Sequence, residues 1–247
     1  MENPYEHASQ GPPAVPPETD QDQLRLDVGR SARILPVTAS AGFLGLVMGI
    51  VGLFGLTLVT AIAFTAAGVD DLEDDRAFMF VATFLGDLGL VAAALLITAR
   101  MTRPTPELFG FRRCPLGPAI GWAVLAFFTY IGLTVVYTEL VNPPQDELPD
   151  QLGRTVLTAV FVMGIAPVVE EFFFRGFLFQ SLRNTWGPVW AVLASAAIFS
   201  AIHFDIDKFV PLVIFGTALA FVFHKTESLW PCIALHAVNN ALAFLAS

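Results

Sequence analysis

The amino-acid sequence predicts an all-α protein, a polytopic membrane helical bundle with about seven transmembrane helices. Of its 247 residues, 55% are hydrophobic and only 14% are charged, and the mean hydropathy is +0.66. This composition is too apolar for an ordinary soluble domain. Several apolar runs reach the ~20 residues that a helix needs to cross a bilayer, and the charged residues gather between these runs.

The chain divides into three regions by composition. Residues 1–36 are rich in Pro, Gln, Asp and Glu, and no basic stretch leads into an apolar core, which predicts a disordered cytoplasmic tail and not a signal peptide. Residues 37–154 hold the N-terminal transmembrane helices. Residues 155–247 hold the remaining helices and most of the polar residues that lie within apolar runs.

Seven apolar runs are the candidate spans. The sixth is the shortest, and about 15 residues barely cross a bilayer unless the neighbouring loops dip inward. In chain order the runs are 41–68, 77–99, 116–140, 155–174, 186–203, 209–223 and 229–245.

Loop charges predict the orientation of these spans. Basic residues follow the second, fourth and sixth spans, whereas acidic residues dominate the opposite loops. The positive-inside rule therefore places the amino terminus in the cytoplasm and the carboxyl terminus outside. We expect an integral protein of a bacterial plasma membrane. The basic residues are Arg100, Arg103, Arg112, Arg113, Arg175, Arg183 and Lys225.

Composition also argues against several other classes of protein. The formal charge of -9 lies largely in the tail and short loops, and no basic patch supports a nucleic-acid partner. Cys114 and Cys232 are isolated, which favours inert thiols over a disulfide or a zinc knuckle. A transporter ranks low because no span is visibly broken and no paired halves appear.

Two adjacent carboxylates, Glu170 and Glu171, stand inside the fourth apolar run. Charged groups are costly in hydrocarbon, so such residues usually face a bundle interior or a water-filled cavity and mark function. Glu171 lies one turn before Arg175, the spacing of an i,i+4 ion pair. Glu170 is rotated by roughly 100° on the same helix and is free to face another group.

Five more polar residues interrupt the apolar runs. A lone histidine in a helix is usually structural, but a carboxylate, two imidazoles and an amide together are the parts of a hydrolytic site. If the chain turns back near residue 186, the two limbs of the hairpin measure roughly 21 and 24 Å and bring Glu170 level with His203. The five residues are Asp87, His203, His236, Asn239 and Asn240.

An acidic residue and a group of phenylalanines each have two possible interpretations. We expect Asp87 to pair with a polar group on a neighbouring helix, with substrate or proton handling as the alternative. We expect the phenylalanines of residues 172–179 to face lipid, with an apolar entry for a lipid or prenyl chain as the alternative.

Three strings in residues 155–244 resemble the motifs of a known family. EEFFFR (170–175), FSAIH (199–203) and HAVNN (236–240) are similar to the EExxxR, FxxxH and HxxxN motifs of the CPBP family. This family comprises the CAAX proteases and bacteriocin-processing (Abi) proteins and is related to the type II CAAX prenyl endopeptidases. The resemblance implies a CAAX-protease-like catalytic core over residues 155–247 and intramembrane proteolysis near the cytoplasmic membrane face.

The resemblance also implies roles for individual residues. Glu170 would activate water together with His203, while His236 and Asn240 would stabilise the oxyanion, and Glu171 and Arg175 would support the site. The substrate would be a peptide or protein, with a lipidated one left open. Because the family includes immunity and scaffolding proteins, a non-catalytic membrane protein is the alternative.

Metal dependence stays open at this point. Glu170, His203 and His236 would make a plausible zinc set with an open position. The HExxH spacing is absent, however, and Asn240 is a poor zinc ligand but a good amide donor. We therefore expect a metal-free, glutamate-dependent hydrolysis, with zinc as the alternative.

Overall fold

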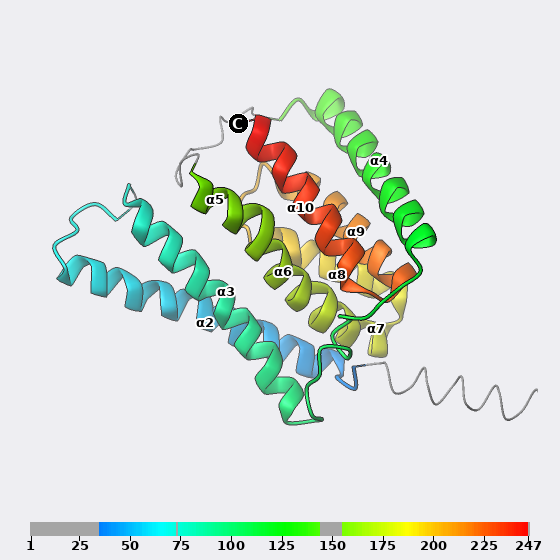
Figure 1. Ribbon diagram of the computed structural model, residues 1–247, viewed down its shortest axis with the longest axis horizontal. Coiled ribbons are helices and arrows are strands. Elements are labelled where there is room, and N and C mark those ends of the chain that lie inside the picture. Colours follow the sequence, from blue (N-terminus) through cyan, green and yellow to red (C-terminus); the bar gives the residue numbers. More distant parts are fainter. Residues whose placement is uncertain (1–34, 73, 144–154, 247) are drawn as a thin grey trace, which may run out of the picture. The chain divides into compact units, whose positions relative to one another are not determined.

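The computed structural model describes residues 35–72, 74–143 and 155–246 (Figure 1). Leu35–Ser247 forms one compact unit, and every regular element in the described ranges is a helix. Six of these helices are long and apolar enough to cross a membrane. The predicted fold class, an all-α polytopic membrane bundle, is confirmed. The prediction of a tail over residues 1–36 falls mostly on residues 1–34, outside the described residues, whereas Leu35 near its end is described and buried.

The first two helices form a tightly packed pair. They are α2 (Ala39–Ala66) and α3 (Arg76–Ala99), and the side chains of Thr38 and Asp75 cap their first turns. A Cβ on Gly52 would lie 3.4 Å from the Cα of Gly89, so the two backbones approach closely. Small residues permit such approach between transmembrane helices. This pair lies against the later helices that carry the polar residues.

The third long helix, α4 (Leu116–Val141), packs on α9 and α10 and is otherwise largely exposed. It ends at Asn142, whose backbone is left-handed with φ 46. Asparagine tolerates this conformation better than most residues, which makes it a suitable helix terminus.

The fourth long helix is continuous from Val156 to Trp186 but contains two segments of different winding. Its parts are α5 (Val156–Val160), η1 (Phe161–Ile165), α6 (Ala166–Glu171), η2 (Phe172–Phe179) and α7 (Gln180–Trp186). The segments η1 and η2 are π-helical, a rare winding that often occurs at functional sites. The glutamate pair therefore lies at the end of the short α-helical segment between them.

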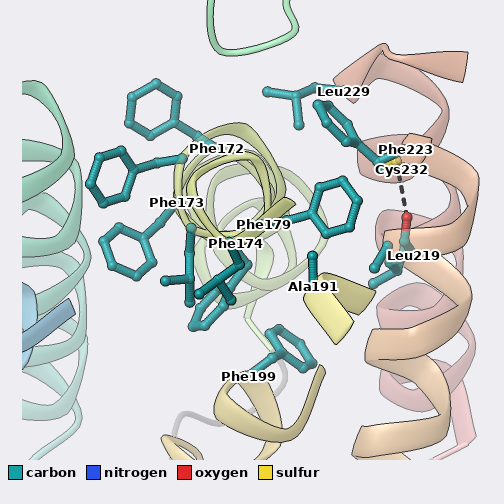
Figure 2. Packing of buried hydrophobic residues seen from close by; sticks show 14 of the residues in the cluster. Phe172, Phe173, Phe174, Phe179, Ala191, Phe199, Leu219, Phe223, Leu229 and Cys232 are labelled. Carbon is teal, nitrogen blue, oxygen red and sulfur yellow. Dashed lines mark hydrogen bonds between the residues drawn. The ribbon is translucent and has the colours of Figure 1, made fainter. Parts of the chain in front are cut away.

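Segment η2 is the centre of the bundle, and all its residues are buried. Figure 2 shows the rings of Phe172, Phe173, Phe174 and Phe179 spread around this helix against neighbouring helices. The expectation that these phenylalanines face lipid is wrong. Helices α2, α3, α8, α9 and α10 all contact η2, and a helix that is apolar on every side is suited equally to lipid and to a protein core.

The last three helices differ from the predicted spans in length. They are α8 (Pro188–Ala201), α9 (Phe209–Thr226) and α10 (Leu229–Ala246). The sixth predicted span is an 18-residue helix, whereas the fifth is the shorter one, with 14 residues. A helix of that length rises about 21 Å, less than the ~30 Å hydrocarbon core. The loop after α8 therefore begins before a full crossing is complete.

Backbone geometry explains where α8 begins and ends. Gly187, with φ 79, makes the turn that separates α7 from α8, a conformation that glycine adopts at little cost. Beyond α8, Phe204 also has a positive φ of 52. The predicted hairpin turn near residue 186 is present, and His203 stands at the end of its second limb.

Candidate active site

A buried ion pair anchors the site. Arg175 Nη1 donates to Glu171 Oε1 at 2.8 Å, and its Nη2 donates to the carbonyl of Gly216 on α9 at 3.1 Å. The side chains of Arg175 and Glu171 are 1% and 0% exposed. The i,i+4 pair predicted from the spacing is present. Buried charges of this kind persist where each is paired and hydrogen-bonded.

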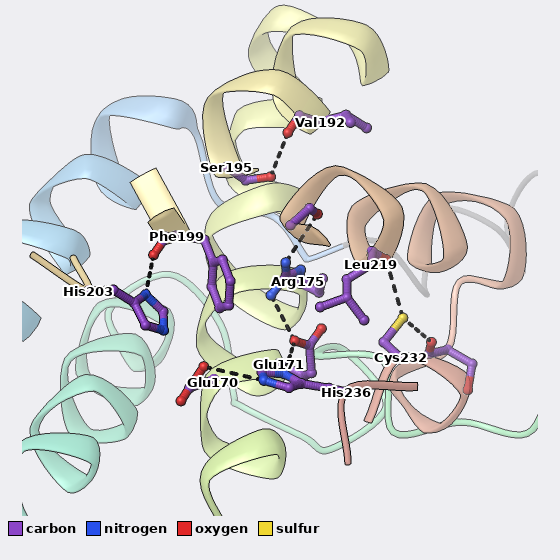
Figure 3. Close-up of polar contacts among 12 residues, drawn as sticks. Glu170, Glu171, Arg175, Val192, Ser195, Phe199, His203, Leu219, Cys232 and His236 are labelled. Carbon is purple, nitrogen blue, oxygen red and sulfur yellow. Dashed lines mark hydrogen bonds and ion pairs between the residues drawn. The ribbon is translucent and has the colours of Figure 1, made fainter. Parts of the chain in front are cut away.

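Glu171 also orients His236. The Nδ1 atom of His236 lies 2.9 Å from Glu171 Oε1, and a hydrogen on Nδ1 donates to that carboxylate. The bond between carboxylate and Nδ1 fixes the ring and leaves Nε2 for other chemistry. Nε2 lies 3.8 Å from Glu170 Oε2. One imidazole ring therefore joins both glutamates, as Figure 3 shows.

Glu170 makes fewer polar contacts than Glu171. Its side chain is 20% exposed, and its Oε2 atom is buried with no hydrogen-bond partner among the described residues. The 3.8 Å separation from His236 is too long for a hydrogen bond. Glu170 thus has a carboxylate oxygen that no described group of the protein satisfies.

His203 lies near this cluster without joining it. Its Nδ1 donates to the carbonyl of Phe199 at 2.7 Å, one turn back on α8, which leaves Nε2 free. The residue is exposed. Within the described ranges it makes neither a hydrogen bond nor an ion pair with Glu170. His236 therefore approaches Glu170 directly, whereas His203 lies beside the cluster without a direct polar contact to Glu170.

Phe199 links the two imidazoles. Its ring centroid lies 4.8 Å from that of His203 and 6.0 Å from that of His236. The guanidinium carbon of Arg175 lies 4.6 Å from the centroid of the same ring. The residue that begins the FxxxH string is therefore an aromatic spacer between three polar side chains.

Asn240 occupies a different position from the glutamates. Its Nδ2 donates at 3.0 Å to the carbonyl of Val162 in η1, so one of its two N–H donors is already engaged. His236 and Asn240 lie one turn apart on α10, and α10 contacts both α6 and η1. Asn239 is half-buried and makes no hydrogen bond within the described ranges.

Asp87 on α3 is a third acid of this region. Its Oδ2 atom is buried and has no hydrogen-bond partner in the described part of the chain. In the described part of the chain, no hydrogen bond or ion pair joins Asp87 to a polar group of a neighbouring helix. The expected pairing of Asp87 therefore stays a prediction.

The donor set matches a zinc site only in part. Glu170 and His236 Nε2 lie near each other, and the bond from His236 Nδ1 to Glu171 resembles the support that a metal-bound histidine receives. His203 does not join them, and no group of three such side chains in the described residues could hold a metal ion together. We therefore derive no step through a metal.

The site also contains features that sequence reasoning missed. The carbonyls of Val162 and Gly216 hold Asn240 and Arg175, but backbone acceptors leave no signal in a sequence. The two π-helical segments were also not predicted, because their side-chain pattern does not differ visibly from that of an α-helix. For Phe199 the available signal was its place at the start of FSAIH.

Comparison with known proteins points to the same family as the three motifs. Residues 152–242, which contain all three motifs, match the family described as "Type II CAAX prenyl endopeptidase Rce1-like". The resemblance to the CPBP family is confirmed. The Bacillus subtilis (strain 168) protein named "Putative membrane peptidase YdiL" is 23% identical over 164 residues, covering 62% of this chain and 67% of that protein. No solved structure matches. Together, the matches to the CPBP family support a membrane protease.

Proposed function

We propose that this CPBP-type protein is a membrane endopeptidase that hydrolyses a peptide bond with water activated by Glu170. The observation that carries the proposal is the pairing of Glu170, which keeps a carboxylate oxygen free, with His236, which is fixed by the buried pair of Glu171 and Arg175. Amide hydrolysis needs a base that takes a proton from water and a group that stabilises the developing negative charge, and Glu170 and His236 can supply these two functions.

Glu170 is the general base in this proposal. It takes a proton from water as the water oxygen attacks the scissile carbonyl, and negative charge develops on the carbonyl oxygen. His236 stabilises that charge when its Nε2, like Nδ1, carries a hydrogen that can be donated to the oxyanion. One such donor is worth about 2.7–4 kcal/mol to the transition state.

His203 and Asn240 complete the machinery when substrate binds. His203 has a free Nε2 and stands at the start of the loop between α8 and α9, so a small movement of that loop carries the ring toward Glu170. Asn240 can serve the oxyanion once it releases the carbonyl of Val162. Catalytic hydrogen bonds are often long before substrate binds and shorten in the complex.

The substrate is a peptide or protein, and the cut lies near the cytoplasmic membrane face. The basic loops support a cytoplasmic amino terminus and an outside carboxyl terminus. Whether the substrate is lipidated is a separate question, which identification of the uncleaved substrate by proteomics answers.

Glu170→Gln tests the proposal. The variant keeps the shape of the side chain but cannot accept a proton, so cleavage should fall by at least ~10²-fold, the low end for a lost acid–base group. Proteomics of membrane fractions should find a peptide that persists only in Glu170→Gln cells. Asp70→Asn, at an exposed acid of the loop between α2 and α3, is the control and should behave like the parent chain.

A non-catalytic immunity or scaffolding role is the second candidate. The engagement of Asn240 by Val162 and the separation of His203 from the glutamates favour it. Under that role Glu170→Gln and His203→Ala lower stability in detergent but leave the cellular phenotype and the membrane proteome unchanged. Full proteolysis in Glu170→Gln would reject the endopeptidase proposal directly.

Metal dependence needs its own measurement. We propose hydrolysis without a metal, because His203 is not arranged to complete a donor set with Glu170 and His236. Metal analysis of purified, active protein should find no stoichiometric zinc, and chelators should leave cleavage intact. About one zinc per chain, with activity lost to a chelator and restored by zinc, would reverse this conclusion.

A further inference from the structure

An apolar groove lies between α4 and α9. Its volume is about 400 Å³, and Val192 of α8 completes its lining. Leu125 and Leu133, which form part of its α4 wall, are 53% and 51% exposed, so the groove opens onto the outside of the bundle. In a membrane this surface faces hydrocarbon. An apolar hollow that opens toward lipid tails fills with them, because unfilled space forfeits dispersion contacts.

Two aromatic rings and a lysine mark one end of the groove. The ring centroids of Trp122 on α4 and Phe221 on α9 lie 5.5 Å apart, and Phe221 also lines the groove. Lys225 Nζ lies 5.3 Å from the centroid of Trp122 and 5.5 Å from that of Phe221. These cation–π contacts hold an ammonium group at this end. A tryptophan is typical of the membrane–water interface, where lipid headgroups lie.

The charge of Lys225 is not neutralised by an acid in the described part of the chain. Glu227, two residues further on, lies 3.9 Å from Arg112 Nη2 and 3.7 Å from Arg183 Nη1. Lys225 is exposed and forms no ion pair in the described ranges. Three basic side chains and one carboxylate therefore stand at this end of α9, and their excess of positive charge suits an anionic headgroup.

The length of the groove matches one leaflet of a bilayer. Val213 lines the groove on α9, and a helix rises about 18 Å from that residue to Lys225. Half of the ~30 Å hydrocarbon core is about 15 Å. A lipid with its phosphate beside Lys225 can therefore lay an acyl chain along the groove toward the middle of the membrane.

A second groove of about 400 Å³, between α4 and α10, lacks this arrangement. Its lining contains neither a basic side chain nor a hydroxyl group. In the described residues, no basic side chain makes a cation–π contact with Trp230 or with the phenylalanines that line it. By contrast, Thr129, Tyr130 and Thr217 bring three hydroxyl groups to the groove between α4 and α9. The lysine and the hydroxyls distinguish that groove from a surface that merely faces lipid.

We propose that the groove between α4 and α9 binds one anionic phospholipid, with its phosphate at Lys225 and an acyl chain along the groove. The occupant is a lipid and not a free phosphate, because most of the lining is apolar and a free anion would leave it uncovered. The inference concerns binding alone and does not depend on the endopeptidase proposal. A protein that cleaves nothing can still hold this lipid.

Thermal unfolding of the purified full chain in detergent tests the site. Dioleoylphosphatidylglycerol should raise the melting temperature in a saturable manner, because a ligand that binds only the folded protein stabilises it. Dioleoylphosphatidylcholine has the same acyl chains without a net charge, and glycerol 3-phosphate has no acyl chain, so neither should stabilise the protein comparably. Equal stabilisation by the two phospholipids would indicate bulk lipid only, and equal stabilisation by glycerol 3-phosphate would indicate a free anion. Either result would overturn the proposal.

Variants of the lysine test the position of the headgroup. Lys225→Met keeps the apolar stem but loses the charge, so the apparent Kd for dioleoylphosphatidylglycerol should rise about 5-fold, the effect of one basic residue near an anionic headgroup. Lys225→Arg should keep most of the affinity. Arg103→Met removes an exposed charge from the loop between α3 and α4 and should leave the Kd unchanged. An unchanged Kd in Lys225→Met would overturn the assigned headgroup position.

A larger side chain in the groove tests the position of the acyl chain. Native mass spectrometry of the parent chain should show one retained dioleoylphosphatidylglycerol, and Thr217→Phe, which fills the groove, should lose it. Ala123→Phe places the same ring in the groove between α4 and α10 and should keep the lipid. Melting without added lipid reports whether both variants fold. Retention of the lipid by folded Thr217→Phe would overturn the groove as the binding site.

Discussion

At the scale of single residues, Arg175 has the largest structural consequence. It neutralises Glu171, which is 0% exposed. In the described residues, the other basic side chain within ion-pair distance of that carboxylate is His236. We expect Arg175→Met to lower the free energy of unfolding by about 3–5 kcal/mol, since removal of one partner leaves a buried charge. Thermal unfolding in detergent measures this loss.

Matched variants identify the cause of that loss. Arg113 is exposed, so Arg113→Met should change stability by no more than ~0.5 kcal/mol. The double variant Arg175→Met with Glu171→Gln should recover part of the loss, because it removes the unpaired charge as well. Equal melting temperatures for Arg175→Met and Arg113→Met would contradict the assigned importance of the buried pair.

At the scale of elements, the close packing around η2 depends on one glycine. A Cβ on Gly176 would lie 2.7 Å from the carbonyl oxygen of Phe109, a backbone atom that cannot move alone. We expect Gly176→Ala to destabilise the fold by ~1–3 kcal/mol through overpacking. Gly121→Ala on α4 meets no atom within 4 Å and should be neutral or slightly stabilising, since alanine favours helices. A comparison of their unfolding temperatures decides the point.

The loop between α8 and α9 gives a pH-dependent prediction at the same scale. The carboxylate of Asp205 accepts hydrogen bonds from the side chain and from the backbone N–H of Lys208. The side-chain hydrogen bond is the main reason that the pKa of Asp205 lies below its ordinary value of 3.8. A lowered folded-state pKa contributes stability above the ordinary pKa and loses it as pH falls through the folded value. The protection of the backbone amides of residues 202–208 against hydrogen exchange, relative to intrinsic exchange at the same pH, should therefore fall only in strong acid.

Asp205→Asn provides the control for that loop. The variant cannot form the ion pair with Lys208, so the amides of residues 202–208 should be less protected than in the parent chain at neutral pH, and their protection should no longer fall in acid. Both side chains are partly exposed, which keeps the energetic effect small. Identical exchange in the two proteins would show that the pair of Asp205 and Lys208 does not stabilise residues 202–208, the segment next to His203.

At the scale of the whole molecule, local relationships were predicted better than distant ones. The pair of Glu171 and Arg175 follows from helical spacing alone, and the turn at Gly187 follows from its sequence. The lack of a direct polar contact between His203 and Glu170 depends on how α8 packs against its neighbours, which no local pattern encodes. The environment of the η2 phenylalanines was mispredicted because apolar side chains suit lipid and protein equally.

The orientation of the whole molecule is the remaining prediction from the sequence. Cys114 lies in the basic loop between α3 and α4 and is half-buried, whereas Cys232 is fully buried. The positive-inside rule places Cys114 on the cytoplasmic side and the acidic loop with Asp70 outside. In intact cells, a membrane-impermeant maleimide should therefore label an Asp70→Cys variant but leave the parent chain unlabelled. Opening the membrane should then expose Cys114 in both. Labelling of the parent chain in intact cells would invert the topology and place the candidate active site nearer the opposite face.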